Sequence, residues 1–182
     1  MLFKHPIAKR LLCAVFVSSC LAGGVQIASS QENPGFTIFS GVEQDNILGY
    51  RLDFGGSPNG WDRYKMRIPS KKMVSGASKF IIKYPDYFYE DGGRFDIKRV
   101  EVRLKDESLP IRDVFWDEEA HIIEIDLEKP ILEAQRVEIV LHNVKNPKFG
   151  GTYYFHCDVL AANDLPIRLY VGTWIVSIGR SN

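Results

Sequence analysis

The stretch RYKMRI, residues 63–68, alternates charged and apolar side chains without a break. Neighbouring side chains of a β-strand point to opposite faces, so this period of two places Tyr64, Met66 and Ile68 on one face. The three basic side chains between them fall on the other face. One face is therefore expected in a core and the other in water, as in a half-buried antiparallel strand.

The same period recurs along the chain in residues 50–54, 99–104, 123–128, 136–141 and 152–159. Turn-forming segments rich in Gly, Pro, Asn and Asp separate these runs. Further strands are expected at Phe80–Tyr84, Pro110–Trp116 and Arg168–Ile178. About eight to ten short strands with no sustained helical period predict an all-β chain, a single immunoglobulin-like antiparallel β-sandwich. The Cys…Trp…Cys pattern of immunoglobulin disulfides is absent.

The N-terminus has the three parts of a secretory signal peptide. Lys4, Lys9 and Arg10 precede a short apolar stretch, and Ala28-Ser29-Ser30 supplies small residues for cleavage before Gln31. The apolar stretch is shorter than the roughly 20 residues that a membrane span needs. The sequence thus predicts residues 1–30 as a signal peptide and residues 31–182 as an exported β-sandwich domain, with residues 31–46 loosely ordered.

A second start of the mature chain stays open. Val17-Ser18-Ser19-Cys20 resembles the motif at which a bacterial lipoprotein is cleaved and lipidated on its cysteine. On either reading the mature chain has no transmembrane span. If cleavage falls before Gln31, Cys157 is the one cysteine left, and its strand phase predicts a side chain in the core.

Charge and motifs exclude several classes of function. The chain has 23 basic and 23 acidic residues, and residues 1–30 hold three of the basic ones, so residues 31–182 carry about −3. A mildly acidic domain argues against a nucleic-acid partner. The sequence has no nucleophile elbow, P-loop, dinucleotide fingerprint or zinc-ligand spacing, so neither an enzyme nor a cofactor is expected.

One unusual loop, residues 84–96, mixes aromatic and acidic side chains around a Gly-Gly pair. Its carboxylates are a candidate oxygen-ligand set for Ca²⁺, although the spacing is not that of an EF-hand: Asp86, Glu90, Asp91 and Asp96. The alternative is a capped loop whose aromatic side chains close one end of the sandwich.

Aromatic side chains suggest a second kind of site. Trp61 follows a glycine-rich loop, and with Tyr87, Phe88 and Tyr89 it is a candidate stacking platform for sugar rings. The alternative for each of these side chains is a place in the core or an anchor for its loop.

Five short blocks in order resemble a known family: GWDRYKMRIP (60–69), IKYP (82–85), NVKNP (143–147), GGTYYF (150–155) and GTW (172–174). The family is the domain of unknown function 2808, and the resemblance extends over residues 58–178. It implies an exported protein of a cyanobacterium, in the periplasm, thylakoid lumen or cell surface, and it implies no reaction.

The sequence therefore favours an exported non-catalytic module that docks on a protein complex of the envelope or lumen. The alternative is a surface module that binds carbohydrate or calcium. An exposed aromatic patch at Trp61 and residues 87–89 would favour carbohydrate, and a contiguous apolar patch rimmed by polar residues would favour a protein partner.

Overall fold

The computed structural model describes residues 41–162 and 167–179. The expected signal peptide, with Cys20, and the proposed start at Gln31 lie outside the described residues. So do residues 31–40 of the segment expected to be loosely ordered. The described remainder of that segment includes one turn of 3₁₀ helix, Gln44–Asn46.

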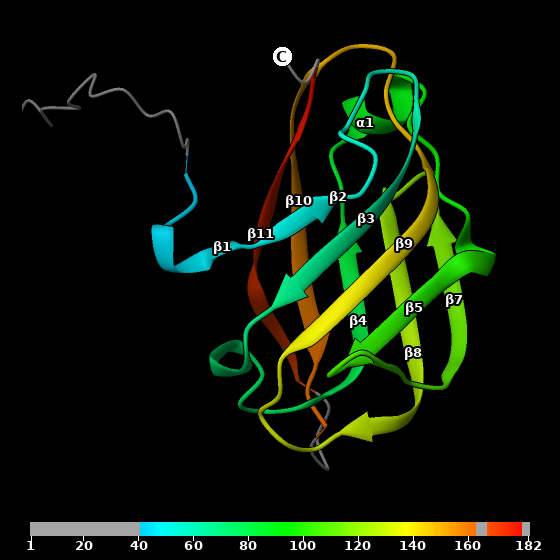
Figure 1. Ribbon diagram of the computed structural model, residues 1–182. Coiled ribbons are helices and arrows are strands. Elements are labelled where there is room, and N and C mark those ends of the chain that lie inside the picture. Colours follow the sequence, from blue (N-terminus) through cyan, green and yellow to red (C-terminus); the bar gives the residue numbers. More distant parts are fainter. Residues whose placement is uncertain (1–40, 163–166, 180–182) are drawn as a thin grey trace, which may run out of the picture. The chain divides into compact units, whose positions relative to one another are not determined.

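The described residues form eleven strands in two sheets (Figure 1). The strands are β1 (Ile47–Leu48), β2 (Tyr50–Leu52), β3 (Trp61–Ile68), β4 (Ala77–Lys83), β5 (Val100–Leu104), β6 (Glu107–Ser108), β7 (Ile111–Asp117), β8 (Ile122–Ile131), β9 (Val137–Lys145), β10 (Gly151–Leu160) and β11 (Arg168–Ile178). The first sheet has the order β1-β11-β10-β4-β8-β7 and the second the order β2-β3-β9-β5-β6. The predicted β-sandwich is confirmed.

The alternating runs set the two faces of each sheet as predicted. In β3, Tyr64, Met66 and Ile68 are fully buried, and the basic side chains between them lie on the outer face. The two layers meet through contacts such as the edge-to-face pair of Tyr64 with Phe155, whose ring centroids are 6.3 Å apart. The indole Nε1 of Trp174 in β11 also donates a 3.1 Å hydrogen bond to the carbonyl of Arg67 in β3. The core therefore lies between the sheets.

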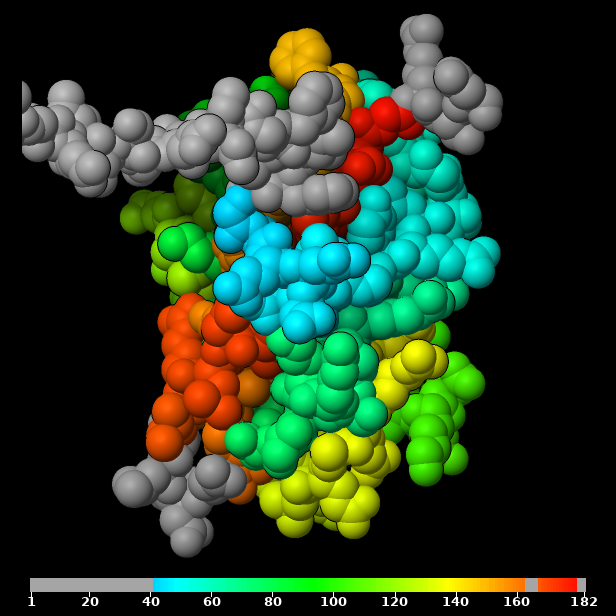
Figure 2. Space-filling view, turned by 90° about the vertical axis from the view of Figure 1, so that its left-hand side faces the viewer, coloured from blue at the N-terminus to red at the C-terminus, as the bar shows by residue number. Residues whose placement is uncertain are grey.

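One edge departs from the expected antiparallel pattern. Strand β1 pairs in parallel with β11 in the first sheet, and after Gly49 the chain continues as β2, which pairs with β3 in the second sheet. Figure 2 views this edge, with the blue-to-cyan segment lying against both layers. Because β1 and β2 are separated by one residue, this segment joins the two sheets covalently at their shared edge.

Three short helical segments lie in connections: a 3₁₀ turn at Ser70–Lys72, the helix α1 at Asp86–Glu90, and a 3₁₀ turn at Ile97–Arg99. Helix α1 falls in the loop 84–96, for which no helix was predicted. It sits at one end of the sandwich (Figure 1), and Phe88 packs there against the rings of Tyr84, Phe95, Tyr153 and Phe155. Within the described residues, none of the helices has the length and hydropathy of a membrane span.

The cysteine prediction is also confirmed. Cys157 is fully buried in β10 with a free thiol, and burial raises the pKa of this thiol well above its usual value. A thiol in this state behaves as a small apolar side chain.

Candidate functional site

Trp61 begins β3 beside a surface groove and is 60% exposed. Its strand neighbour on β9 is Lys145, whose ammonium lies 5.3 Å from the centroid of the indole. The same ammonium donates a hydrogen bond to the carbonyl of Asn59. The indole is thus held against the sheet on one side and left open to solvent on the other.

The loop before Trp61 is fixed by a buried carboxylate. Asp62 is 1% exposed, and its two oxygens accept hydrogen bonds from the backbone N–H groups of Phe54 (2.9 Å), Gly56 (2.8 Å) and Arg63 (2.7 Å). A buried charged group is stable only with such partners. Gly56 adopts a φ of 65°, and a Cβ there would lie 2.7 Å from the Leu52 side chain, so the turn requires glycine.

A second buried pair fixes the other end of this loop. The Tyr64 hydroxyl donates a 2.6 Å hydrogen bond to Oδ1 of Asn146, and Nδ2 of Asn146 donates to the carbonyl of Ser57 at 2.9 Å. Burial, together with the charge of Asp62, raises the pKa of Tyr64 well above its usual value, so the hydroxyl stays a donor. The loop 53–60 therefore has a defined conformation beside Trp61.

Arg94 and Trp116 form a second wall of the groove, and Tyr89 packs against both of them. The Arg94 guanidinium lies 3.8 Å from the centroid of the Tyr89 ring and donates to the Tyr89 carbonyl at 2.7 Å. Tyr89 contacts Trp116 edge to face, and Nε1 of Trp116 donates to the Tyr84 hydroxyl at 2.7 Å. These contacts limit the rotamers of the wall.

Polar groups lie between the two walls. Asp96 caps the 3₁₀ turn Ile97–Arg99 by accepting from the N–H of Lys98 at 3.3 Å, and its second oxygen accepts from Nδ2 of Asn143 at 3.3 Å. Asn143 is exposed and adopts a φ of 51°. The resulting hollow has a volume of about 400 Å³. We call it the Trp61 groove, and its lining is Trp61, Arg94, Phe95, Asp96, Ile97, Lys98, Trp116 and Asn143.

The four predicted stacking residues are in different environments. Trp61 lies in the groove, and Tyr89 supports its wall behind Arg94. Tyr87 is 39% exposed, and its hydroxyl donates to the carbonyl of Thr152. Phe88 is 0% exposed and belongs to the core, so of the two roles that the sequence left open for it the structure gives the core position and not the stacking platform. The reason is that one helical turn points three consecutive side chains in different directions.

The four predicted calcium ligands do not come together. Asp86 accepts from its neighbour's N–H at the start of α1, and Asp96 is engaged in the groove. Glu90 is exposed and Asp91 half-buried. Over residues 41–162 and 167–179, no group of three or more His, Cys, Asp or Glu side chains is placed to hold a metal ion. The calcium interpretation of this loop therefore has no support from the geometry.

Sequence reasoning missed Arg94, Lys98, Trp116 and Asn143. Their grouping depends on strand pairing, through an isolated bridge between Arg94 and Lys145. For Asp62, by contrast, the sequence does contain a signal. This acid lies two residues before Tyr64, at a position of β3 where the alternation predicts an inward-facing apolar side chain. An acid at such a position indicates a buried carboxylate with dedicated hydrogen-bond partners.

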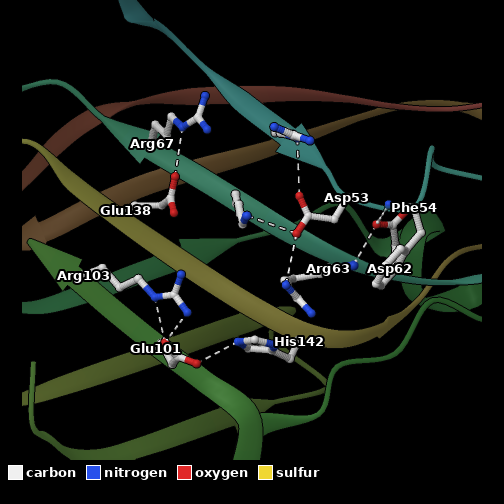
Figure 3. Close-up of polar contacts among 11 residues, drawn as sticks. Asp53, Phe54, Asp62, Arg63, Arg67, Glu101, Arg103, Glu138 and His142 are labelled. Carbon is white, nitrogen blue, oxygen red and sulfur yellow. Dashed lines mark hydrogen bonds and ion pairs between the residues drawn. The ribbon is translucent and has the colours of Figure 1, made fainter. Parts of the chain in front are cut away.

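The outer face of the second sheet, next to the groove, is strongly charged (Figure 3). Arg67 pairs with Glu138 at 2.9 Å, and Glu101 pairs with Arg103 at 2.6 Å and His142 at 2.9 Å. The Asp53 carboxylate lies within 3.4 Å of three cationic groups: Arg51, Arg63 and Lys65.

The described residues thus define an immunoglobulin-like β-sandwich with an aromatic and polar groove beside a charged sheet face. The chain belongs to the family described as "Protein of unknown function (DUF2808)", whose model matches residues 36–178. This match confirms the resemblance noted from the sequence. The comparison with curated proteins gave no match.

Solved structures with a similar fold include BslA, a bacterial hydrophobin. It is 14% identical, with 74% of this chain and 95% of that chain covered and a TM-score of 0.48. An uncharacterized protein from Nocardia farcinica with an immunoglobulin-like fold is 8% identical, with coverage of 74% and 99% and a TM-score of 0.45. The collagen-binding domain of a Staphylococcus aureus adhesin is 9% identical, with coverage of 73% and 97% and a TM-score of 0.42. These similarities concern the fold alone.

Proposed function

We propose that the chain is an exported, non-catalytic binding module that holds a glycan in the Trp61 groove. The observation that carries this proposal is an exposed indole, Trp61, beside a hollow lined by Asp96 and Asn143. A sugar ring has an apolar face that packs on a flat aromatic ring and hydroxyl groups that need oriented hydrogen-bond partners. The groove offers both kinds of contact.

Preorganisation supports this assignment. Asp62, Asn146 and Lys145 fix the chain around Trp61, and Arg94 fixes the facing wall. Side chains that are already ordered lose little conformational entropy when a ligand binds, so weak stacking contacts yield useful affinity.

Export follows from the N-terminal signal peptide expected at residues 1–30, and a glycan ligand suits a protein of the envelope or cell surface. The absence of nucleophile-elbow, P-loop and dinucleotide motifs in the sequence supports a module that binds without catalysis.

The test is glycan binding by the purified chain, measured by calorimetry and by tryptophan fluorescence. Replacing Trp61 with Ala should weaken binding about 30-fold, since an aromatic anchor contributes about 2 kcal/mol. The matched control is Phe115→Ala, which removes a 56% exposed aromatic ring from β7 in the other sheet. Equal affinities of the wild type and Trp61→Ala would refute the groove as the site, and so would an equal loss in the control.

A second candidate function is docking on an envelope protein complex. It is favoured by two exposed rings in the loops at the α1 end, Phe54 at 62% and Phe149 at 65%. Exposed aromatic side chains are typical anchors of protein interfaces. Affinity capture from the native envelope tests it: a partner held by wild type and by Trp61→Ala, but lost with Phe54→Ala/Phe149→Ala, would support docking.

A further inference from the structure

Three neighbouring hollows lie on the outer face of the second sheet and at its border with the first sheet, which contributes Trp116 to the Trp61 groove. The Trp61 groove shares Lys98 with a hollow of about 350 Å³, which is lined by Lys98, Arg99, Val100, Glu101 and His142. Next along β5 and β9 is a hollow of about 480 Å³, which is lined by Arg67, Arg103, Lys105, Asp106, Arg136 and Glu138. The Glu101–Arg103 ion pair joins the last two (Figure 3). We call the whole row the basic track.

The basic track has an excess of positive charge. In its last hollow, four cationic side chains of the described residues face two carboxylates. Arg67 and Arg103 are paired with Glu138 and Glu101, whereas Arg99, Lys105 and Arg136 are exposed and form no ion pair with any described residue. These three cations are available to a ligand at no cost in broken ion pairs.

Strands β7 and β8 of the first sheet, on the opposite side of the sandwich, have the reverse charge. On β7 and β8 in the first sheet, five carboxylates alternate with core residues: Asp113, Asp117, Glu124, Asp126 and Glu128. Lys79 on β4 pairs with two of them, Glu124 at 2.6 Å and Asp126 at 3.1 Å. A domain near neutrality overall is thus basic on one face, and such segregation attracts and orients a polyanion.

The shape of the track narrows the ligand class. Asn143 on β9 and Arg136, the residue just before β9, are seven residues apart along the strand. This separation corresponds to roughly 23 Å at about 3.3 Å per residue. Cations spread over this length match repeated charges on an extended chain better than one compact anion. Along β9, Val140 on this face is fully buried, and among the residues that line the three hollows Trp61 is the large apolar side chain with an exposed surface. A single exposed ring is a small apolar area compared with the apolar face that membrane insertion needs.

We infer that the ligand is an acidic polysaccharide, with one ring on Trp61 and the carboxylates of following rings along Arg99, Lys105 and Arg136. This inference rests on the proposed glycan site and adds the chemical class of its ligand. Repeated carboxylates on an extended chain are the feature that the basic track recognises.

The experiment compares an oligogalacturonate with its methyl-esterified form, which has the same rings and no charge. The purified chain should bind the acid form at least about tenfold more tightly at low salt, and 0.5 M NaCl should remove most of this preference. The variant Arg99→Gln/Lys105→Gln/Arg136→Gln should lose roughly tenfold in affinity for the acid form and keep its affinity for the ester.

The matched control is Lys71→Gln/Lys83→Gln/Lys129→Gln, which removes three exposed cations outside the track and should bind like wild type. Binding of both glycans with no preference for the acid would overturn the basic track and leave the proposed function standing. Binding of neither would refute the proposed function itself. Anionic vesicles and duplex DNA are tested with the same variant. If the triple substitution weakens their binding as much as it weakens binding of the acid glycan, the track attracts any polyanion, and the assignment to an acidic polysaccharide is overturned.

Discussion

The carboxylate of Asp62 accepts the backbone N–H of Gly56 at 2.8 Å, in a turn whose positive φ suits glycine. This contact joins the loop 53–60 to the start of strand β3, where Trp61 is the first residue. Asp62 thus occupies an inward-facing position of β3 but stabilises an exposed loop, through hydrogen bonds to its backbone that an apolar side chain could not form.

Asp62→Asn should therefore destabilise the fold although the shape of the side chain is kept. The amide retains one acceptor oxygen and brings N–H donors toward N–H donors, so we expect a loss of about 1–3 kcal/mol in the free energy of unfolding. Urea denaturation followed by circular dichroism measures it. Asp86→Asn, at an exposed site with a single local contact, should change stability by less than about 0.5 kcal/mol. Similar values for the two variants would contradict the anchoring role.

The two-layer sandwich could be predicted from the sequence because the alternation of apolar and polar residues decides which side chains face the core. The phase that buries Tyr64 also places Trp61 outward, in agreement with its exposure. Alternation does not say which strands are neighbours, and the groove needs Arg94, Asn143 and Trp116 from segments that meet only after pairing. The basic track was hidden for the same reason. A net charge of about −3 over residues 31–182 averages an acidic face and a basic face.

The aromatic triplet shows a second limit. Tyr87, Phe88 and Tyr89 are chemically similar, and the sequence left open for each of them a binding platform or a place in the core. A single turn of helix directs Phe88 into the core and leaves Tyr87 exposed. Short helices of this kind have too few residues for a periodic signal.

Phe88→Ala should accordingly be far more costly than Tyr87→Ala. The Phe88 ring touches four other aromatic rings in the closed end of the sandwich, so its removal leaves a cavity and should cost about 3–5 kcal/mol. Tyr87→Ala, at a partly exposed site, should cost no more than about 1 kcal/mol. Thermal and urea unfolding of both variants provide the comparison. A small loss for Phe88→Ala would mean that its ring is not part of the core.

Cys157 provides a probe of the same core. Its burial and raised pKa keep the thiol away from reagents, so labelling requires opening of the sheet. Alkylation at pH 8 should be at least about a hundredfold slower in buffer than in denaturing urea. Peptide mass spectrometry assigns the label to Cys157 and separates it from Cys13 and Cys20. Rapid native labelling would contradict the position of β10 in the core.

Glu101 should make stability depend on acid pH. Burial favours its protonated form, but hydrogen bonds from Arg103 and Ser108 and the charge of Arg103 outweigh burial and hold the pKa of Glu101 below its usual 4.5. A lowered pKa in the folded state stabilises the fold above the unfolded value, and this stabilisation is lost as the pH falls through the folded value. Glu101→Gln should thus lower the free energy of unfolding at pH 7, by under about 1 kcal/mol because the side chain is one-third exposed. The difference from wild type should shrink below pH 4.5.

Urea denaturation at pH 7 and pH 3 measures both values, with Glu107→Gln as an exposed control of equal charge change. A Glu101→Gln deficit that is the same at both pH values would show that the loss comes from packing and not from the ionised carboxylate.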